Sequence, residues 1–203
     1  HCREICDQLD VPLLVAAAND APAAGDSIEA WARSARYAAL ADELAPDDLA
    51  LTAHHRDDLA ETLLLMALRG GGPHGLASIA PRRPLGAGIL LRPLLELPQS
   101  VLRERVTRAG LRWLDDPAND DARLDRNFLR HEVMPRLVAR WPAACANLAH
   151  AASLQRGAVE LLDAYADEAL APVTATGPLD LAVLEGLPPV RQLLLLRRWL
   201  RLR

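Results

Sequence analysis

The sequence contains no lysine, and all 23 of its basic residues are arginine. Any cationic site in this chain must therefore be built from guanidinium groups, which stay charged and can bind phosphate oxygens in pairs. Aromatic residues are also scarce, at 3% of 203 residues, so the 51% hydrophobic content rests largely on Ala and Leu. This composition predicts a helix-rich α/β protein with an aliphatic core.

Long apolar runs and paired cysteines are missing as well. No run approaches the ~18 apolar residues that a membrane helix needs, and no signal peptide is present. The three cysteines, Cys2, Cys6 and Cys145, lack CxxC spacing, which argues against a disulfide framework and against a structural zinc site. We therefore expect a cytoplasmic protein without a membrane partner.

Charge is unevenly distributed along the chain, although the net charge is only -4. Residues 1–68 hold 4 Arg against 13 acids, a balance of -9, whereas residues 69–203 hold 19 Arg against 14 acids, a balance of +5. A polyanion such as RNA would meet the second region more readily. The alternative is that acidic helix faces simply cluster early in the chain.

The order of apolar and amphipathic segments predicts a parallel sheet with crossover helices. Residues 11–17 and 49–53 are apolar enough to be strands covered on both faces, and helical patterns follow each of them. Ligands bind such sheets at the carboxyl ends of the strands, where His54 and His55 lie. A chain that begins with a helix leading into a strand is expected to lack the first strand of its sheet.

The second half of the chain is predominantly helical. Helical periodicity continues from Asn127 to the end, with breaks at prolines, and a long Ala- and Leu-rich helix is expected from about residue 143. We predict two domains, an α/β domain at 1–142 and a smaller all-α domain at 143–203.

Two carboxylates follow the 49–53 segment at the spacing of one helix face. Asp58 and Glu61 are three residues apart, shortly after His54. Adjacent carboxylates can hold Mg²⁺ or bind a substrate ammonium group. The alternative is an ordinary acidic helix start, because Asp and Glu favour the positive end of the helix dipole.

Two further segments are candidates for nucleotide contact. Arg33 and Arg36 share one helix face and could clamp phosphate oxygens, or they could form a solvated face with an ion pair from Glu29 to Arg33. Gly70 belongs to a Gly-rich loop that could let a nucleotide backbone come close. This loop follows a helix, unlike the usual phosphate-binding loop, so a flexible helix end is the alternative.

A second arginine pair is a candidate for RNA contact. Arg126 and Arg130 are four residues apart near a helix start, a position that favours anions. A structural network with Asp115 or Asp116 is the alternative.

Read in order, these segments resemble the tRNA(Ile)-lysidine synthase family of the N-type ATP pyrophosphatases. The similar motifs are EAxARxxRY at 29–37, HHxxDxxET at 54–62, RGxGxxGLxGM at 69–79, RPLL at 91–95 and WxxDxSNxDxxxxRNxxRxxxxPxL at 113–137. The resemblance is clear over residues 1–142 and looser beyond them.

The resemblance implies a Rossmann-like fold of the adenine nucleotide alpha hydrolase type. It also implies an enzyme that uses ATP and Mg²⁺ to ligate L-lysine to the wobble cytidine (C34) of tRNA(Ile) with a CAU anticodon. The implied site residues are His54, Asp58, Glu61 and Arg33 for catalysis, Arg36 and Gly70 for the cofactor, and Arg126 and Arg130 for RNA. The metal ligands stay open, with Asp58 and Glu61 as candidates, and so does the oligomeric state, a homodimer being one option.

The sequence departs from the family pattern in one respect. The phosphate-binding SGGxDS loop is absent, so the chain by itself is expected to bind ATP poorly, and a tRNA-binding domain is expected after Arg203. Two other readings stay open. A tRNA thiolation enzyme of the same group would need paired cysteines, and a non-catalytic RNA-binding or scaffolding fragment would need no phosphate-binding loop.

Overall fold

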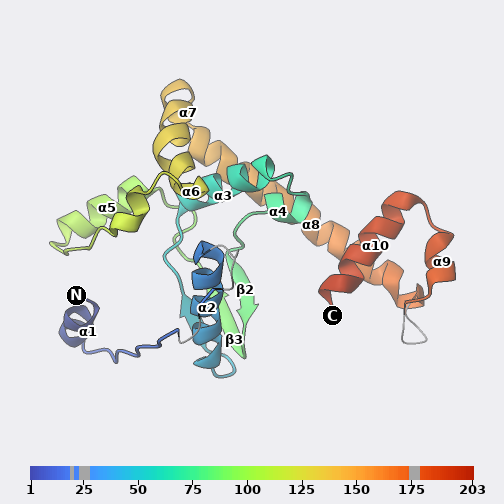
Figure 1. The fold of residues 1–203 in the computed structure, drawn as a ribbon, viewed down its shortest axis with the longest axis horizontal. Coiled ribbons are helices and arrows are strands. Elements are labelled where there is room, and N and C mark those ends of the chain that lie inside the picture. Colours follow the sequence, from blue (N-terminus) through green and yellow to red (C-terminus); the bar gives the residue numbers. More distant parts are fainter. Residues whose placement is uncertain (19–20, 23–27, 174–178) are drawn as a thin grey trace.

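The computed structural model describes residues 1–18, 21–22, 28–173 and 179–203. A small sheet lies among helices, and one long helix connects this region to two further helices near the C-terminus (Figure 1). The strands are β1 (Leu49–Leu51), β2 (Arg82–Leu85) and β3 (Gly88–Leu91). The α-helices are α1 (Cys2–Leu9), α2 (Ile28–Asp42), α3 (Arg56–Leu68), α4 (Pro73–Leu76), α5 (Gln99–Arg108), α6 (Asp125–Phe128), α7 (Met134–Arg140), α8 (Ala144–Val173), α9 (Leu181–Glu185) and α10 (Pro189–Arg201).

The sheet is mixed, with strand order β1-β3-β2. β1 runs parallel to β3, with Ala50 opposite Leu90, whereas β2 runs antiparallel to β3. The prediction of a parallel sheet is therefore confirmed for β1 and β3 and wrong for β2. The physical reason is the two-residue connection after Leu85, Gly86–Ala87, because so short a turn can only join antiparallel strands. Gly86 supplies the positive φ of 55° that this turn needs.

In the part of the chain that the structure describes, only one face of the sheet is covered. Ala50, Leu85 and Leu90 are buried against α2 through Tyr37, Leu40, Ala41 and Leu44. Leu49 and Leu51 point to the opposite face and are exposed. The prediction that both faces of β1 are covered is therefore wrong, because no element among the described residues packs on the side of Leu49 and Leu51.

The apolar segment 11–17 is extended and exposed along its length. It forms no ladder with any strand in the described part of the chain, and the helix before it, α1, buries no residue. The prediction of a buried strand here is wrong. An apolar run becomes a buried strand only when a neighbouring strand and a packing layer exist, and the described residues provide neither.

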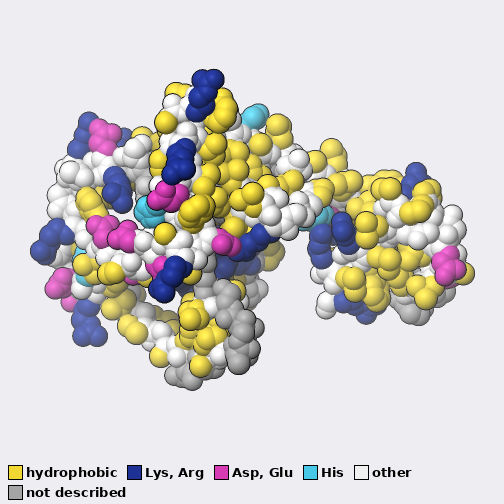
Figure 2. Space-filling model, turned by 45° about the horizontal axis from the view of Figure 1, so that its top comes forward, with side chains coloured by type: hydrophobic (Ala, Val, Ile, Leu, Met, Phe, Trp, Pro, Cys, Tyr) yellow, Lys and Arg dark blue, Asp and Glu magenta, His cyan; other side chains and the backbone are white. Residues whose placement is uncertain are grey.

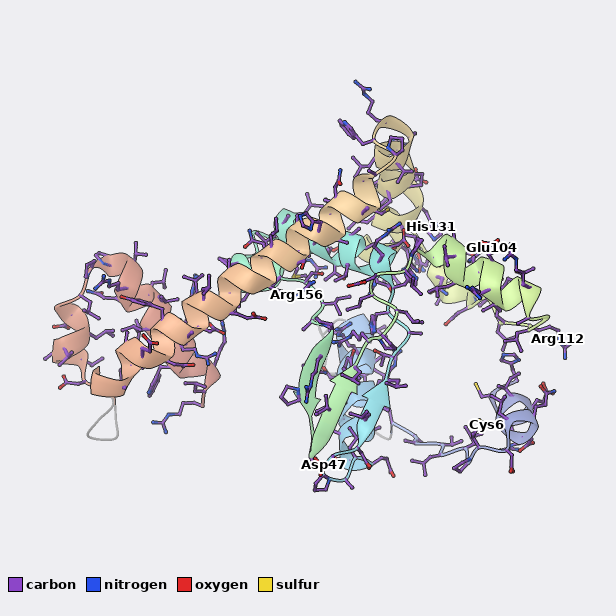
Figure 3. The ribbon with its side chains drawn as sticks, turned by 180° about the vertical axis from the view of Figure 1, so that it is seen from behind. Cys6, Asp47, Glu104, Arg112, His131 and Arg156 are labelled. Carbon is purple, nitrogen blue, oxygen red and sulfur yellow. The ribbon has the colours of Figure 1, made fainter. Side chains whose placement is uncertain are left out.

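Helix α8 contributes to two hydrophobic clusters. Its first half packs on α3 and α4, where Ala149 joins Leu59, Ile79 and Leu95, and its second half joins Ala166 and Leu170 to Leu184 and Leu195. Arg156 of α8 also donates to the carbonyl oxygens of Ala77 (3.2 Å) and Ile79 (3.4 Å), on the face visible in Figure 3. The end of α8 forms a separate lobe with α9 and α10 (Figure 2). The domain boundary at 142/143 stays a prediction.

Although α8 has 30 residues, neither it nor any other helix in the described ranges is apolar enough over a sufficient length to cross a membrane.

The stretch from α6 to α7 projects from the body as a broken helix (Figure 1). A 3₁₀ turn, Pro117–Asp120, precedes α6, and a π-helical turn, Leu129–Val133, joins α6 to α7. Pro135 follows this turn and has no N–H to donate to a carbonyl one turn earlier, which accounts for the break in regular helix geometry. Arg126 and Arg130 lie at the base of this projection.

Candidate functional site

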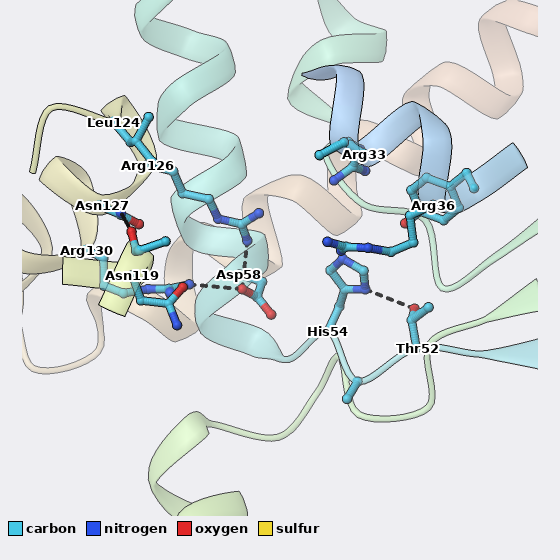
Figure 4. A pocket seen from close by; sticks show the side chains of 14 residues that line it. Arg33, Arg36, Thr52, His54, Asp58, Asn119, Leu124, Arg126, Asn127 and Arg130 are labelled. Carbon is cyan, nitrogen blue, oxygen red and sulfur yellow. Dashed lines mark hydrogen bonds and ion pairs between the residues drawn. The ribbon is translucent and has the colours of Figure 1, made fainter. Parts of the chain in front are cut away.

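A cavity of about 520 Å³ opens at the carboxyl end of β1. Four parts of the chain line it: α2, the turn between β1 and α3, the first turn of α3, and the segment 118–130 (Figure 4). Its lining residues are Ala32, Arg33, Arg36, Tyr37, Thr52, Ala53, His54, Asp58, Ala118, Asn119, Leu124, Arg126, Asn127 and Arg130. Four arginines and one carboxylate make this lining strongly cationic, and the position at the strand ends agrees with the prediction from the sequence.

Asp58 has a role at the start of α3. Its Oδ2 accepts a hydrogen bond from the backbone N–H of His55 at 2.9 Å, as the third helical residue does in a capping box. The acidic helix start that was the alternative interpretation is therefore real. This capping hydrogen bond uses Oδ2 of Asp58, so Oδ1 is available for other partners.

The predicted catalytic carboxylates and the predicted RNA-binding arginines form one network. Arg126 donates from Nη2 to Asp58 Oδ1 at 2.7 Å and from Nε to Glu61 Oε2 at 3.0 Å. Arg130 donates from Nε to Glu61 Oε1 at 2.7 Å, and from Nη2 to Glu61 Oε2 at 2.8 Å and to Asp58 Oδ1 at 3.3 Å. The alternative of a structural network with Asp115 or Asp116 is wrong, because α3 supplies the partners instead.

This network holds the two guanidinium groups at the wall of the cavity. The hydrogen bonds from Arg130 to Glu61 raise the pKa of the Arg130 guanidinium, which outweighs the opposite effect of burial. Glu61 is only 3% exposed and does not itself line the cavity. Glu61 therefore acts on the site by fixing the two arginines, whereas Asp58 faces the cavity directly.

The carboxylate pair does not fit Mg²⁺ as it stands. Asp58 and Glu61 together accept five hydrogen bonds from Arg126 and Arg130, so two positive charges already balance their two negative charges. In the described ranges, no group of three or more His, Cys, Asp or Glu side chains is placed to hold a metal ion. A metal ion could bind between these two carboxylates only by displacing a guanidinium group.

His54 is held as a neutral imidazole. Its Nδ1 lies 2.9 Å from Thr52 Oγ1, with the two side chains sharing a hydrogen bond (Figure 4). Burial is the main cause that lowers the pKa of His54 to about 4; the charges of Arg92, Arg126 and Arg33 act in the same direction, against the opposing effect of Asp58. At neutral pH this side chain can exchange hydrogen bonds with a ligand without adding charge.

This low pKa predicts a pH-dependent stability. Between pH 6.5 and 4 the unfolded chain binds a proton at His54 that the folded chain does not, so stability is full above pH 6.5 and falls as the pH approaches 4. Wild type should lose more of its free energy of unfolding between pH 7 and pH 4.5 than His54→Gln does. We expect this difference to be roughly 1–2 kcal/mol, after allowance for solvent screening. Urea denaturation of both proteins at pH 7 and near pH 4.5 measures it, with the exposed His150→Gln as control. An equal loss in wild type and His54→Gln would contradict the assignment.

The first arginine pair also lies at the cavity. Arg33 and Arg36 of α2 both line it, and the Arg33 guanidinium lies over the Tyr37 ring, 5.2 Å from its centroid. The alternative ion pair with Glu29 involves a side chain outside the described residues. Either arginine can therefore meet an anion in this cavity.

Gly70 is not brought to the cavity. It follows the last turn of α3, at the opposite end of this 13-residue helix from His54, and it is absent from the lining. Its φ of 69° explains the glycine, because other residues adopt this conformation at a cost. The prediction that Gly70 contacts the cofactor finds no support in this geometry.

Sequence reasoning missed several side chains that shape the site. Asn127 is buried and donates to the carbonyl oxygens of Ala118 (2.8 Å) and Asp121 (3.0 Å), which holds Asn119 at the cavity wall. Tyr37 lines the cavity from α2. Both residues belong to the motifs that carry the family resemblance, and this was the available signal.

A cationic cavity at the carboxyl end of a sheet strand is the arrangement of a nucleotide-binding α/β protein. The family model described as the PP-loop domain matches residues 1–137, and the chain belongs to this family.

The chain is also similar to curated tRNA(Ile)-lysidine synthases. It is 45% identical over 206 residues to the protein of Methylococcus capsulatus, covering 100% of this chain and 47% of the relative. It is 46% identical over 208 residues to the protein of Pseudomonas putida, covering 98% of this chain and 48% of the relative. The protein of Xanthomonas axonopodis pv. citri is 46% identical over 201 residues, covering 98% of this chain and 46% of the relative. The chain thus spans about half the length of these relatives.

Proposed function

We propose that the full gene product containing this chain is a tRNA(Ile)-lysidine synthase. It would use ATP to activate the wobble cytidine (C34) of tRNA(Ile) with a CAU anticodon, and then join L-lysine to that base, releasing AMP and pyrophosphate. The observation that carries the proposal is the cavity in which Arg33, Arg36, Arg126 and Arg130 converge around Asp58. The similarity to the named synthases across the whole chain supports it.

The arginines would serve the first step. The carbonyl oxygen of the cytidine attacks the α-phosphorus of ATP, and the bond to pyrophosphate breaks, so negative charge moves along the phosphoryl oxygens. Fixed cations stabilise this charge without reorganising during the reaction. Arg33 and Arg36 are placed for this task on the α2 side of the cavity. Mg²⁺ is proposed to enter with the triphosphate, because the guanidinium groups already occupy Asp58 and Glu61.

Asp58 would serve the second step. The side-chain amine of lysine attacks the activated carbonyl carbon, AMP leaves, and the ammonium formed must lose a proton. Among the described residues that line the cavity, Asp58 is the one carboxylate. Its Oδ2, which in this part of the chain accepts a hydrogen bond only from the His55 N–H, would orient this amine and accept the proton, while Oδ1 stays bonded to Arg126 and Arg130. The neutral imidazole of His54 beside it can hold the base or the amine through a hydrogen bond.

Arg126 and Arg130 would face the RNA. They form the wall opposite α2, and an RNA substrate would place the reaction in the cytoplasm.

We expect Arg126→Gln to weaken tRNA binding and to reduce the slope of log K against log salt by up to about one. Filter binding between low and moderate salt measures it, with the exposed Arg108→Gln of α5 as a matched control and thermal melting as a check of folding. Equal slopes for wild type and both variants would count against RNA contact at this wall.

The decisive experiment is lysine incorporation by the full gene product. Unmodified tRNA(Ile), ATP and radiolabelled lysine should give labelled tRNA, and a tRNA(Ile) transcript with U in place of the wobble cytidine should give none. Absence of label with the unmodified tRNA would reject the proposed function. Binding of tRNA without label would instead favour the non-catalytic RNA-binding alternative.

A further inference from the structure

A buried arginine lies behind the cavity, and none of the described carboxylates is its partner. Arg92, directly after β3, is only 4% exposed. Its Nη1 donates to the carbonyl oxygen of Ala80 at 2.5 Å and its Nη2 donates to the Tyr37 hydroxyl at 3.3 Å, while Nε has no hydrogen-bond partner among the described residues. No ion pair to Arg92 occurs within the part of the chain that the structure describes. Burying a guanidinium group that has only neutral partners costs desolvation free energy, so we asked which function its burial serves.

Tyr37 is the side chain on which this arginine acts. Its ring packs on the hydrophobic cluster of the sheet, and its hydroxyl is held by Arg92. Two more guanidinium groups lie over the ring, those of Arg33 at 5.2 Å and Arg83 at 4.6 Å from its centroid. Apolar packing therefore fixes the Tyr37 ring, and the hydrogen bond from Arg92 fixes its hydroxyl group. Arg33 packs on this ring and also lines the cavity.

We propose that Tyr37 is a positioning residue for nucleotide binding, which holds Arg33 at the cavity wall and is itself held in place by the buried Arg92. This inference rests on the proposed function only in taking the phosphates of ATP as the anion that Arg33 meets. An arginine side chain that packs on nothing loses conformational entropy about several rotatable bonds when it binds a phosphate. A guanidinium already resting on an aromatic ring loses less, so binding is stronger.

The charges around Tyr37 agree with this role. Burial by itself would raise the pKa of the Tyr37 hydroxyl, but the hydrogen bond from Arg92 and the charges of Arg33, Arg92 and Arg83 together lower it. Three guanidinium groups thus surround one phenol. An anion in the neighbouring cavity would offset this excess of positive charge.

The test compares the two tyrosines of the chain. Tyr165 on α8 also lies under an arginine, Arg191 at 5.8 Å, but it is exposed and does not line the cavity. We expect Tyr37→Leu in the full gene product to weaken ATP binding about fivefold in isothermal titration calorimetry. Tyr37→Phe, which keeps the ring, should weaken it less, and Tyr165→Leu should leave it unchanged. Equal affinities for wild type and Tyr37→Leu would overturn the inference.

A double-mutant cycle separates positioning from loss of packing. If Tyr37 acts through Arg33, then Arg33→Ala should abolish the effect of Tyr37→Leu, so that the double variant binds ATP as weakly as Arg33→Ala alone. The same fivefold loss in both backgrounds would show that Tyr37 acts on the fold and not through Arg33. Because ATP binding needs no lysine, a wild type that binds ATP but adds no lysine would reject the proposed function and leave this inference standing. A wild type that does not bind ATP would overturn the inference.

Discussion

Replacing Glu61 with alanine should lower the free energy of unfolding by about 3–5 kcal/mol. The Glu61 carboxylate is 3% exposed and accepts hydrogen bonds from both Arg126 and Arg130. Its removal would leave two partly buried guanidinium groups with Asp58 as their only carboxylate. An uncompensated buried charge costs far more than the loss of an exposed ion pair. Urea denaturation at neutral pH measures the effect.

Two further variants test whether the loss of stability in Glu61→Ala comes from uncompensated buried charge. Glu104→Ala on α5 removes an exposed i,i+4 partner of Arg108 and should change stability by less than about 0.5 kcal/mol. Adding Arg130→Met to Glu61→Ala should restore part of the stability, because it removes one uncompensated charge. If Glu61→Ala behaves like Glu104→Ala, then the network contributes little to the fold.

Replacing Asp58 with asparagine should reduce lysine incorporation at least 100-fold while leaving the activation step largely intact. The amide has the same shape, and its oxygen still accepts hydrogen bonds from the two arginines. Its NH2 group cannot accept the bond from the His55 N–H, so thermal melting checks the fold, and the amide cannot take a proton from an amine. Activation is followed separately as tRNA-dependent exchange of pyrophosphate into ATP, which needs no lysine. We expect this exchange to stay within roughly threefold of wild type, since the asparagine adds no barrier to attack on phosphorus.

The neighbouring Asp57 supplies the matched control. Its Oδ2 accepts a hydrogen bond from the backbone N–H of Gln99 at 2.7 Å, at the start of α5, and it does not line the cavity. Asp57→Asn should therefore leave both reactions near the wild-type rate. Parallel losses of exchange and incorporation in Asp58→Asn would indicate that Asp58 only supports the arginines.

Several parts of the site could be predicted because they depend on one element at a time. The turn after β1 placed His54 at the strand ends, and helical spacing placed Asp58 and Glu61 on one face of α3. The arginines of α2 were also expected near the nucleotide, and they line the cavity. The predictions of burial were wrong where an apolar segment was assumed to have a neighbouring strand or a covering helix. Residues 11–17 and the outer face of β1 have the composition of buried strands, but burial depends on a neighbour.

The sequence by itself determined which side chains share a helix face and which turn follows a strand, because the period of each element is set by its own backbone geometry. Only the tertiary structure decided that Asp58 and Glu61 meet Arg126 and Arg130, pairs that lie 65 to 72 residues apart. It likewise decided that Tyr37 lies between Arg33 and a buried Arg92. Such contacts depend on how separate elements pack, and the spacing of residues within one element carries no information about the side chains of another.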